Sequence, residues 1–382
     1  MKNSRIKIKS TCLVLLLWML LLLNPVSKIW AGEDSWKLTL FTPRKEKDPF
    51  WGLFVNHARK ATTDLGGQLE VYYADGNREK MRRQIEQAAS KAGDQEVLVF
   101  PNFKKGAGSF LKIIEKKKVP AFIVNSGFTE EENGGRPRQH YQFWIGQLLP
   151  DEKQTGNMLA RTLVEEGLRR FKKHRNGPLE MIAITGIISD YASIERTEGL
   201  KRYAMTEKKV FLRQIIPASW KADAAETGFG LLKKRFPKVR LVWTASDVMA
   251  GGVIRAAEKM QLNPGKDLII GGVDWAEQGL QSVQQGKQYA SAGGHFLEGG
   301  WATVLVYDYL QGKDFAEHGL SWKSRMGLIR SSDWESKSEL FQRIRPENIN
   351  YRKYSRYLHP ERDSYDFSLE SLKSGEYMVN GN

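Results

Sequence analysis

The sequence contains only one cysteine, Cys12, among 382 residues. A single cysteine cannot form an intramolecular disulfide, so a large ordinary hydrophobic core has to hold the fold together. Long apolar runs are also missing, because the run at residues 12–23 has 12 residues and a membrane-spanning helix needs about 20. These two absences exclude a disulfide-stapled scaffold and argue against a helix that crosses a membrane.

Enzyme motifs are absent as well. There is no Gly-x-Ser-x-Gly elbow of a hydrolase, no His-Glu-x-x-His or Cys/His metal cluster and no phosphate loop of the Gly-x4-Gly-Lys type. The six histidines are scattered along the chain. We therefore expect neither an enzymatic activity nor a metal or cofactor. One catalytic alternative stays open, in which Asp247 and Asp274 are paired carboxylates of a glycosidase, although no acid/base partner signature accompanies them.

The N-terminal segment has the three parts of a secretory signal peptide. Residues 1–9 are basic, residues 12–23 are apolar, and a small residue, Ala31, stands at a plausible cleavage point. We therefore expect residues 1–31 to be a signal peptide and the remaining chain to lie in the periplasm. An uncleaved N-terminal anchor is the alternative, because Ile29 is a poor residue two positions before the cleavage point.

The net charge of +15 at pH 7 invites a nucleic-acid interpretation. Residues 1–31 carry five basic residues and no acidic one, so the charge falls from +15 to +10 for the rest of the chain. The basic runs at 116–118, 169–175 and 233–235 are typical of solvated helix faces. Because the charge is spread out and the chain is expected outside the cytoplasm, we expect no nucleic-acid partner. Contact with an anionic membrane surface or partner stays open.

Short β-rich runs alternate with longer amphipathic runs along the chain. Strands are expected at 37–41, 68–73, 96–100, 121–124, 141–145, 179–184, 209–215, 239–244, 268–272 and 289–292. Helices are expected at 51–65, 78–92, 106–117, 152–173, 193–206, 222–235, 248–260, 276–284 and 298–310. This alternation predicts an α/β protein whose parallel sheets have helices on both faces. Ten strands are too many for one open sheet here, so we expect two sheets with a crossing near 148–152.

The pattern weakens after about residue 330, where few apolar residues remain among Arg, Tyr, Ser, Glu and Asp. We expect residues 343–365 to be irregular, partly ordered chain that wraps the surface. Residues 375–382 are expected to be frayed.

The first candidate site follows the first expected strand, because ligands in such folds bind beyond the carboxyl ends of strands. Asp48, Phe50 and Trp51 stand there, and Pro49 opens the next helix. Flat aromatic rings at this place can stack on the C–H faces of a sugar ring. The alternative is that Phe50 and Trp51 form the first core turn of the helix.

The second candidate is Arg196, one turn inside the helix that follows the strand at 179–184. Its planar guanidinium can bind vicinal hydroxyls or a carboxylate through two hydrogen bonds. The alternative is a surface arginine that pairs with Glu195 or Glu198.

Three further strand ends carry polar candidates. Ser246 or Asp247 caps the following helix, and its neighbour can still reach a cleft. Asp274 closes a strand with no basic residue near it in sequence and can accept a hydrogen bond from a hydroxyl. His295 stands near a second expected crossing, where a purely structural role is the alternative.

Together these motifs resemble the type I periplasmic binding proteins, the family of ribose-binding and autoinducer-2-binding proteins, over about residues 36–330. The matching motifs are Asp48-Pro-Phe-Trp51, Glu195-Arg-Thr-Glu-Gly199, Ser246-Asp247, Gly272-Val-Asp274 and Gln285-Gly-Lys287. Asn125 stands where ribose binders carry an Asp-Arg pair and is similar to the autoinducer-2 binders, which puts ribose itself in doubt. His295 falls near a position where the family has Gln or Arg. The resemblance implies that Asn125 and His295 also bind the ligand.

The resemblance implies two Rossmann-like lobes with parallel sheets, joined by a hinge of three crossing segments. The first lobe would hold residues 36–147 and 295–322, and the second lobe 148–294 and 323–345. A ligand would bind between the lobes, which close around it by hinge motion. Residues 346–382 would form a C-terminal extension that the simple sugar binders lack.

The implied function is to capture a small sugar or sugar-like polyhydroxylated ligand. The protein, expected to be a monomer, would present that ligand to an ABC permease in the inner membrane. The alternative output is sensing, in which the closed lobes signal to a membrane histidine kinase or cyclase. A transcription regulator of the lactose-repressor type shares this core but needs an N-terminal helix-turn-helix of about 50–60 residues, and an apolar signal occupies that place.

Overall fold

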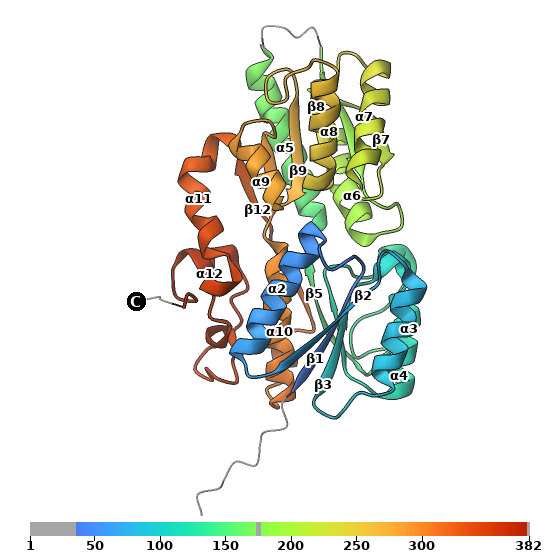
Figure 1. Cartoon of the computed structure of the whole chain (residues 1–382), viewed down its shortest axis with the longest axis vertical. Helices are drawn as coiled ribbons and strands as arrows, with labels where there is room; N and C mark the ends of the chain where they lie inside the picture. Colours follow the sequence, from blue (N-terminus) through green and yellow to red (C-terminus); the bar gives the residue numbers. More distant parts are fainter. Residues whose placement is uncertain (1–35, 173–176, 380–382) are drawn as a thin grey trace, which may run out of the picture. The chain divides into compact units, whose positions relative to one another are not determined.

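The computed structural model describes residues 36–172 and 177–379, shown in Figure 1. The expected signal peptide at 1–31, with Cys12 and the cleavage point after Ala31, lies outside these residues. The chain from Trp36 onward forms one unit by its internal contacts. In the part that the structure describes, no helix is both long and apolar enough to cross a bilayer.

The first lobe is built on a six-stranded sheet whose neighbouring strands all run parallel. Its order is β11-β5-β4-β3-β1-β2, with β1 (Lys37–Thr42), β2 (Gln68–Tyr73), β3 (Glu96–Phe100), β4 (Ala121–Val124), β5 (Trp144–Pro150) and β11 (Ser321–Ser324). The helices that cover it are α2 (Pro49–Asp64), α3 (Arg78–Ala89), α4 (Ala107–Lys117) and α10 (Glu298–Leu310).

The second lobe has its own six-stranded sheet in the order β12-β10-β9-β8-β6-β7. Its strands are β6 (Leu179–Thr185), β7 (Val210–Pro217), β8 (Leu241–Thr244), β9 (Ile269–Asp274), β10 (Ala290–Gly293) and β12 (Gly327–Arg330), of which β12 alone runs antiparallel to its neighbour. Its helices are α5 (Glu152–Arg170), α6 (Tyr191–Thr206), α7 (Ala222–Arg235), α8 (Asp247–Lys259) and α9 (Glu277–Gln284). The predicted α/β class, with two lobes of mainly parallel sheet, is confirmed.

The inner strands form where apolar residues follow one another without polar alternation. All residues of β3, β4, β8 and β9 are buried, which suits strands covered by helices on both faces. The helices begin at side-chain caps, such as Asp48 for α2 and Ser246 for α8. Caps and strand ends therefore meet at the same edge of each sheet.

Three segments connect the two sheets. They lie between β5 and α5 at Pro150–Asp151, between β10 and α10 at 293–298, and between β11 and β12 at 324–327. The strand expected at 141–145 is wrong in its bounds, because the sheet uses Trp144–Pro150. Gly146 lies inside this strand, where a Cβ atom would come within 2.9 Å of the Phe122 ring and 3.0 Å of the Phe315 ring. Gly146, which stands just beyond the strand expected from sequence, is therefore needed for the packing of these two rings.

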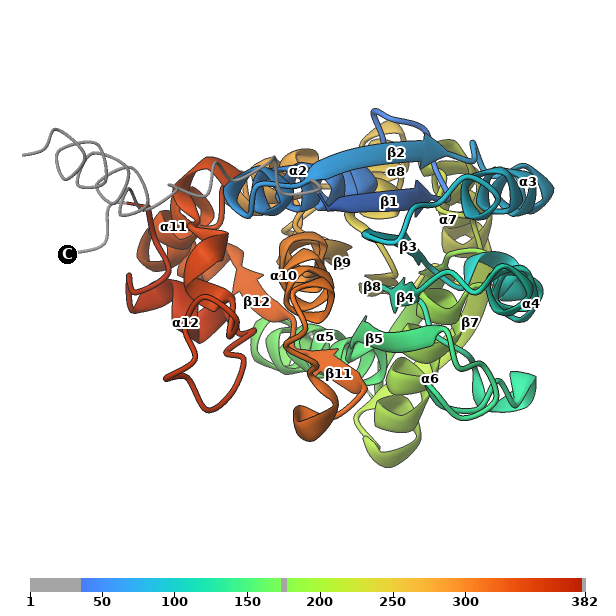
Figure 2. The same cartoon turned by 90° about the horizontal axis from the view of Figure 1, so that it is seen from below.

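The C-terminal extension is more ordered than the sequence predicts. It contains a short turn of 3₁₀ helix (Tyr351–Tyr354), which packs against α2 and α10, and α12 (Leu369–Lys373). The helix α11 (Trp334–Arg343) precedes the extension and lies beside α12, on the side of β12, in both views (Figures 1 and 2). The buried residues of the extension join the hydrophobic core of the first lobe: Ile349, Tyr351, Tyr354, Leu369, Leu372 and Tyr377. The expectation of irregular surface chain at 343–365 is wrong in this respect, because tyrosines spaced among charged residues supply the apolar surface.

The end of the extension is paired rather than frayed as far as residue 379. The Asn350 N–H donates to the Tyr377 carbonyl at 2.9 Å, and the Val379 N–H donates to the Asn348 carbonyl at 2.9 Å. Residues 380–382 lie outside the described part. Just before the extension, the Phe341 ring of α11 packs edge-on against the Trp275 ring, with centroids 5.1 Å apart.

Candidate functional site

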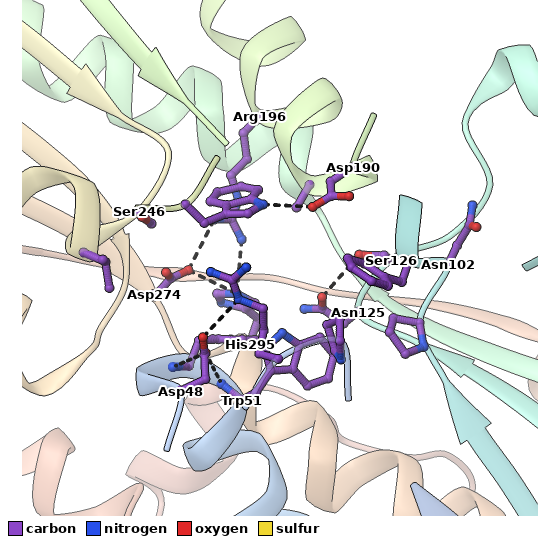
Figure 3. Close-up of a pocket in the computed structure, with 18 residues that line it drawn as sticks. Asp48, Trp51, Asn102, Asn125, Ser126, Asp190, Arg196, Ser246, Asp274 and His295 are labelled. Atoms are coloured by element: carbon purple, nitrogen blue, oxygen red, sulfur yellow. Dashed lines mark hydrogen bonds and ion pairs between the residues drawn. The ribbon is translucent and has the colours of Figure 1, made fainter. Parts of the chain in front are cut away.

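A cavity of about 100 Å³ lies between the lobes, where strand-end loops of both sheets meet (Figure 3). Eight of the nine predicted residues line it: Asp48, Phe50, Trp51, Asn125, Arg196, Ser246, Asp274 and His295. Residues from six separate segments, expected near the carboxyl ends of parallel strands, therefore lie together in one place.

The first wall comes from the start of α2. The Asp48 carboxylate caps this helix by accepting from the Phe50 and Trp51 N–H groups at 3.1 and 3.0 Å, and it accepts from Arg44 Nε at 3.2 Å. These contacts hold the aromatic pair at the cavity. The two rings meet edge to face, with centroids 5.5 Å apart.

The two aromatic residues differ in burial. Trp51 is 7% exposed and belongs to the core of the first lobe as well as lining the cavity. Phe50 is partly exposed, and its ring stacks on the His295 ring at a centroid distance of 4.4 Å. The alternative of a core turn holds for Trp51, and both residues line the cavity. Stacking of these rings on a sugar stays a prediction.

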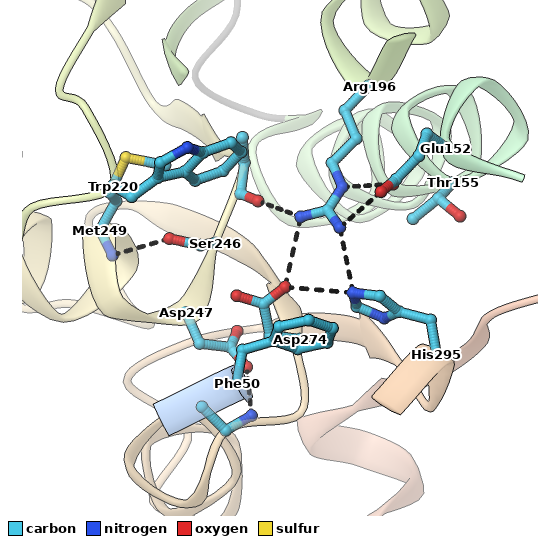
Figure 4. Close-up of polar contacts among 12 residues, drawn as sticks. Phe50, Glu152, Thr155, Arg196, Trp220, Ser246, Asp247, Met249, Asp274 and His295 are labelled. Carbon is cyan, nitrogen blue, oxygen red and sulfur yellow. Dashed lines mark hydrogen bonds and ion pairs between the residues drawn. The ribbon is translucent and has the colours of Figure 1, made fainter. Parts of the chain in front are cut away.

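Arg196 lines the cavity and is 3% exposed. Figure 4 shows its guanidinium between Glu152, Asp274 and His295. Its guanidinium binds Glu152 through Nε to Oε2 and through Nη2 to Oε1 at 2.9 Å. Nη1 donates to the Ala245 carbonyl at 2.7 Å and to Asp274 Oδ1 at 3.2 Å, and Nη2 lies 3.2 Å from His295 Nε2. These contacts occupy all five N–H groups of an arginine. The surface pairing with Glu195 or Glu198 expected as the alternative does not occur.

Glu152 is the partner that sequence reasoning missed. It opens α5, whereas Arg196 lies in α6, and the two helices approach closely. A Cβ atom on Gly156 would lie 1.9 Å from the Arg196 carbonyl oxygen, and one on Gly199 would lie 2.0 Å from the Lys153 carbonyl oxygen. Glycine at both places allows the backbones to touch, and so lets a fully buried carboxylate meet the guanidinium.

Asp274 stands at the end of β9 in a left-handed backbone conformation, with φ of 115°, and the next residue, Trp275, has φ of 55°. Burial raises the pKa of Asp274 well above its ordinary value, although the Arg196 charge opposes that rise. Arg196 and His295 both lie against Oδ1, at 3.2 and 3.6 Å. Within the described chain no hydrogen-bond partner contacts Oδ2, so this oxygen is the acceptor left to the cavity.

His295 is buried, and burial followed by the Arg196 charge lowers its pKa well below the ordinary value. The imidazole is therefore neutral. Because Arg196 can only donate, Nε2 accepts, and the proton is on Nδ1. Nδ1 has no hydrogen-bond partner among the residues of the described structure.

Asp247 is the predicted residue that does not line the cavity. Its carboxylate accepts from Gln288 Nε2 at 2.7 Å, from Ser291 Oγ at 2.8 Å and from the Ala276 N–H at 3.1 Å. Burial raises the pKa of Asp247 to about 7. The structure thus places this side chain beneath the loop that carries Asp274, whereas its neighbour Ser246 both caps α8 and lines the cavity.

Asn125 has a left-handed backbone with φ of 61°, and its Oδ1 accepts from Ser126 Oγ at 3.3 Å. Across the cavity, Trp220 Nε1 donates to Asp190 Oδ2 at 2.9 Å. The Trp220 ring lies 5.9 Å from the Arg196 guanidinium carbon. Trp220 was missed, and its place after the strand at β7 was the signal that could have found it.

The remaining polar lining comes from four residues that follow strand ends: Arg44, Asn102, Ser126 and Asp190. Burial raises the pKa of Asp190. No group of three or more His, Cys, Asp or Glu side chains that could hold a metal ion occurs in residues 36–172 and 177–379. The cavity is thus lined by polar groups that can form hydrogen bonds and by aromatic rings that can stack on a ligand.

Comparison with protein-family models matches residues 39–314 to one described as a periplasmic binding protein domain. No protein with a curated description matches the chain. Among solved structures, a periplasmic sugar-binding protein from Pseudomonas fluorescens is similar, with 26% identity and a TM-score of 0.77 over 88% of this chain and 99% of that one.

Two other solved structures share the fold at lower identity. A solute-binding protein of an ABC transporter from Bacillus halodurans C-125, solved with myo-inositol, has 15% identity and a TM-score of 0.68 over 81% of this chain and 99% of that one. The binding protein of the arabinose ABC transporter from Shewanella sp. ANA-3, bound to L-arabinofuranose, has 17% identity and a TM-score of 0.68 over 79% and 94%.

Proposed function

Since the chain belongs to the periplasmic binding protein family, a family of solute-binding proteins rather than enzymes, we propose that it captures one sugar or sugar-like polyhydroxylated molecule in the cavity between its lobes. The observation that carries this proposal is the lining itself. Carboxylate, amide and guanidinium groups converge there between the rings of Phe50, Trp51 and Trp220. Hydroxyl groups need such donors and acceptors, while the C–H faces of a sugar ring suit aromatic walls.

The size of the cavity favours a monosaccharide. A volume of about 100 Å³ has room for several water-sized groups, at about 10–15 Å³ each. A single sugar ring with its hydroxyls suits this volume, whereas the further rings of an oligosaccharide would have to lie outside the cavity. Of the three similar structures, one is of a sugar-binding protein and the other two hold myo-inositol and L-arabinofuranose, which are both small polyhydroxylated molecules.

We assign the roles as follows. Asp274 Oδ2 accepts from a ligand hydroxyl, and Arg196 Nη1 holds that carboxylate in place through Oδ1. Phe50 stacks on the ligand ring, and Trp51 supports it. Asn125, Asp48 and Ser246 contribute polar contacts at the walls. Asp247 fixes the loop that carries Asp274 and does not touch the ligand.

The three connecting segments form the hinge, and the ligand closes the lobes because it contacts both of them. We further propose that the chain is exported by residues 1–31 and presents its closed form to the permease of an ABC transporter. Location in the periplasm follows from the family, and the signal peptide is the route that the sequence predicts.

The experiment that tests this function is isothermal titration calorimetry on protein that has been unfolded and refolded to remove bound ligand. The panel holds pentoses, hexoses, inositols and, as a control, amino acids. Binding of one sugar or polyol class with one molecule per chain supports the proposal, as does a rise in melting temperature with ligand. Binding of amino acids alone, or of nothing in the panel, contradicts it.

The transport partner needs a separate test. Ligand-loaded and ligand-free protein are each immobilised, and detergent-solubilised inner membranes from the native host are passed over them. Ligand-dependent retention of an ABC permease supports transport. Retention of a histidine kinase or cyclase instead contradicts it and favours the sensing output.

A further inference from the structure

A second hollow opens beyond the cavity, at the mouth of the cleft. This mouth groove has a volume of about 780 Å³ and shares Arg44 and Asp48 with the cavity wall. Loops after β1 and β3 of the first lobe and after β7 of the second lobe line it. It is therefore a continuation of the ligand cavity that both lobes share.

The mouth groove is strongly basic. Five of its lining residues are cationic: Arg44, Lys45, Lys47, Lys104 and Lys221. Its two carboxylates are already engaged, since Asp48 accepts from Arg44 Nε at 3.2 Å and Asp75 pairs with Lys80.

The four lysines of the groove have no acidic partner. Within the described ranges Lys45, Lys47, Lys104 and Lys221 take part in no ion pair. Four like charges around one hollow repel one another and create a positive potential that an anion relieves. The groove therefore carries more positive charge than the two carboxylates of its lining balance, and its Lys104 and Arg44 charges also act on Asp190 in the cavity wall.

Two features distinguish the groove from a surface on which charged side chains move independently. The Lys104 ammonium is held by the Gly76 carbonyl at 2.8 Å and lies 5.0 Å from the centroid of the Phe103 ring, which itself lines the cavity. On the other lobe, Lys221 is the N-cap of α7, and no side chain caps the N–H groups of that helix. The partial positive charge of the helix start adds to that of the lysine.

Accepting the proposed function, we propose that the ligand is an anionic monosaccharide, a sugar acid or a sugar phosphate. The sugar ring occupies the cavity, and the carboxylate or phosphate lies in the mouth groove between Lys47, Lys104 and Lys221. Because these lysines come from both lobes, the anionic group bridges the two sides of the cleft. The inner cavity binds the hydroxyl groups of the sugar, and the mouth groove binds its anionic group.

The test compares three ligands with the same ring: galactose, galacturonate and galactose 6-phosphate, each titrated calorimetrically into the refolded protein. The same series is run with glucose. At least one anionic member of the preferred series should bind ten-fold or more tighter than its neutral parent. That preference should shrink when the salt concentration rises from 50 to 500 mM, because salt screens exposed charges.

A charge-reversed variant sharpens the test. The double variant Lys47→Glu with Lys221→Glu should lower the affinity for the anionic ligand at least ten-fold and leave the affinity for the neutral sugar unchanged. The matched control is Lys116→Glu with Lys117→Glu, which makes the same charge change at the far end of α4 and should change neither affinity. The salt dependence of the unaltered protein provides the answer even where the groove variant does not fold.

The outcomes separate the two proposals. Neutral and anionic sugars of equal affinity overturn the anionic subsite and leave the proposed function standing. Absence of binding by every sugar overturns the proposed function itself. If only the sugar phosphate, or only the sugar acid, binds more tightly than the neutral sugar, the subsite is supported and its anion is identified.

Discussion

Two buried carboxylates, Asp274 in the cleft and Asp308 under the C-terminal extension, differ in what surrounds them. Asp308 accepts from the Ser355 hydroxyl, from the Arg356 N–H at 2.7 Å and from the Tyr365 hydroxyl at 2.8 Å. Its donors are neutral, and both oxygens are engaged. Asp274 has charged and ionisable neighbours on one oxygen and the cavity on the other.

The comparison separates anchoring from binding. Burial raises the pKa of both carboxyl groups, so burial alone does not distinguish them. The distinguishing feature is an acceptor that the fold leaves without a partner beside a cavity. The residues around Asp308 attach the extension to α10. The residues around Asp274 orient its carboxylate and leave one oxygen as an acceptor for a ligand.

The largest effect should come from Arg196→Ala, because it leaves Glu152 buried without its cation. The free energy of unfolding should fall by about 3–5 kcal/mol, and sugar binding should be lost. Urea unfolding and calorimetry measure the two effects. The double variant Arg196→Met with Glu152→Gln should recover most of the stability but not the binding. Recovery of binding as well would show that the Arg196 cluster is only an anchor.

Asp308→Ala should affect stability alone. It leaves the hydroxyls of Ser355 and Tyr365 and one N–H group unsatisfied, so the free energy of unfolding should fall by about 3 kcal/mol. Sugar affinity of the remaining folded protein should be unchanged. The control is Asp223→Ala, a fully exposed carboxylate, which should stay within about 0.5 kcal/mol. A loss of affinity in Asp308→Ala would break the distinction between the two regions.

The pH dependence of Asp247 should be intermediate in size. Its pKa is about 7 in the folded protein and about 3.9 in an unfolded chain. Between these values the folded state binds more protons, so this group makes stability fall as pH rises from about 4 to 7. The upper limit is about 4 kcal/mol, and we expect about 2 kcal/mol because water penetration softens burial.

Melting curves of the unaltered protein and of Asp247→Asn between pH 4 and 8 measure this contribution. The difference in melting temperature between the two proteins should change across that window and stay constant above pH 7. A constant difference at every pH would mean that Asp247 is ionised throughout.

The smallest effect should come from Phe50→Ala. The stacking of this ring on a sugar and on His295 is worth about 1 kcal/mol, so affinity should fall several-fold while stability changes little. The control is Phe211→Ala, which removes an exposed ring from β7 and should leave affinity unchanged. A large loss of stability in Phe50→Ala would assign this residue to the core together with Trp51.

The sequence predicted the fold and eight of the 18 residues that line the cavity for the same reason. Parallel strands place their carboxyl ends along one edge, so Asp48, Asn125, Arg196 and Asp274 could be brought together without knowing any contact. The family resemblance is confirmed by the match over residues 39–314. The role of each of these residues toward a ligand stays a prediction.

What could not be predicted depends on backbone details. The place of Trp220 after β7 marks it as a candidate, but its ring reaches the cavity only through two successive left-handed residues, Ser219 and Trp220, with φ of 53° and 62°. Neither residue type signals that conformation. Of the neighbours Ser246 and Asp247, the pattern could not show which side chain turns toward the cavity. Glu152 meets Arg196 only because two helices touch at glycines, a contact between residues far apart in the chain.

The order in which the lobes draw on the chain has a consequence for synthesis. The second lobe takes all of its strands but β12 from residues 179–293, so its core can close as soon as that stretch has left the ribosome. The first lobe needs α10, β11 and the tyrosines as far as Tyr377. Domains fold as units while the chain emerges from its N-terminal end. The lobe that is made first is therefore the lobe that is finished last.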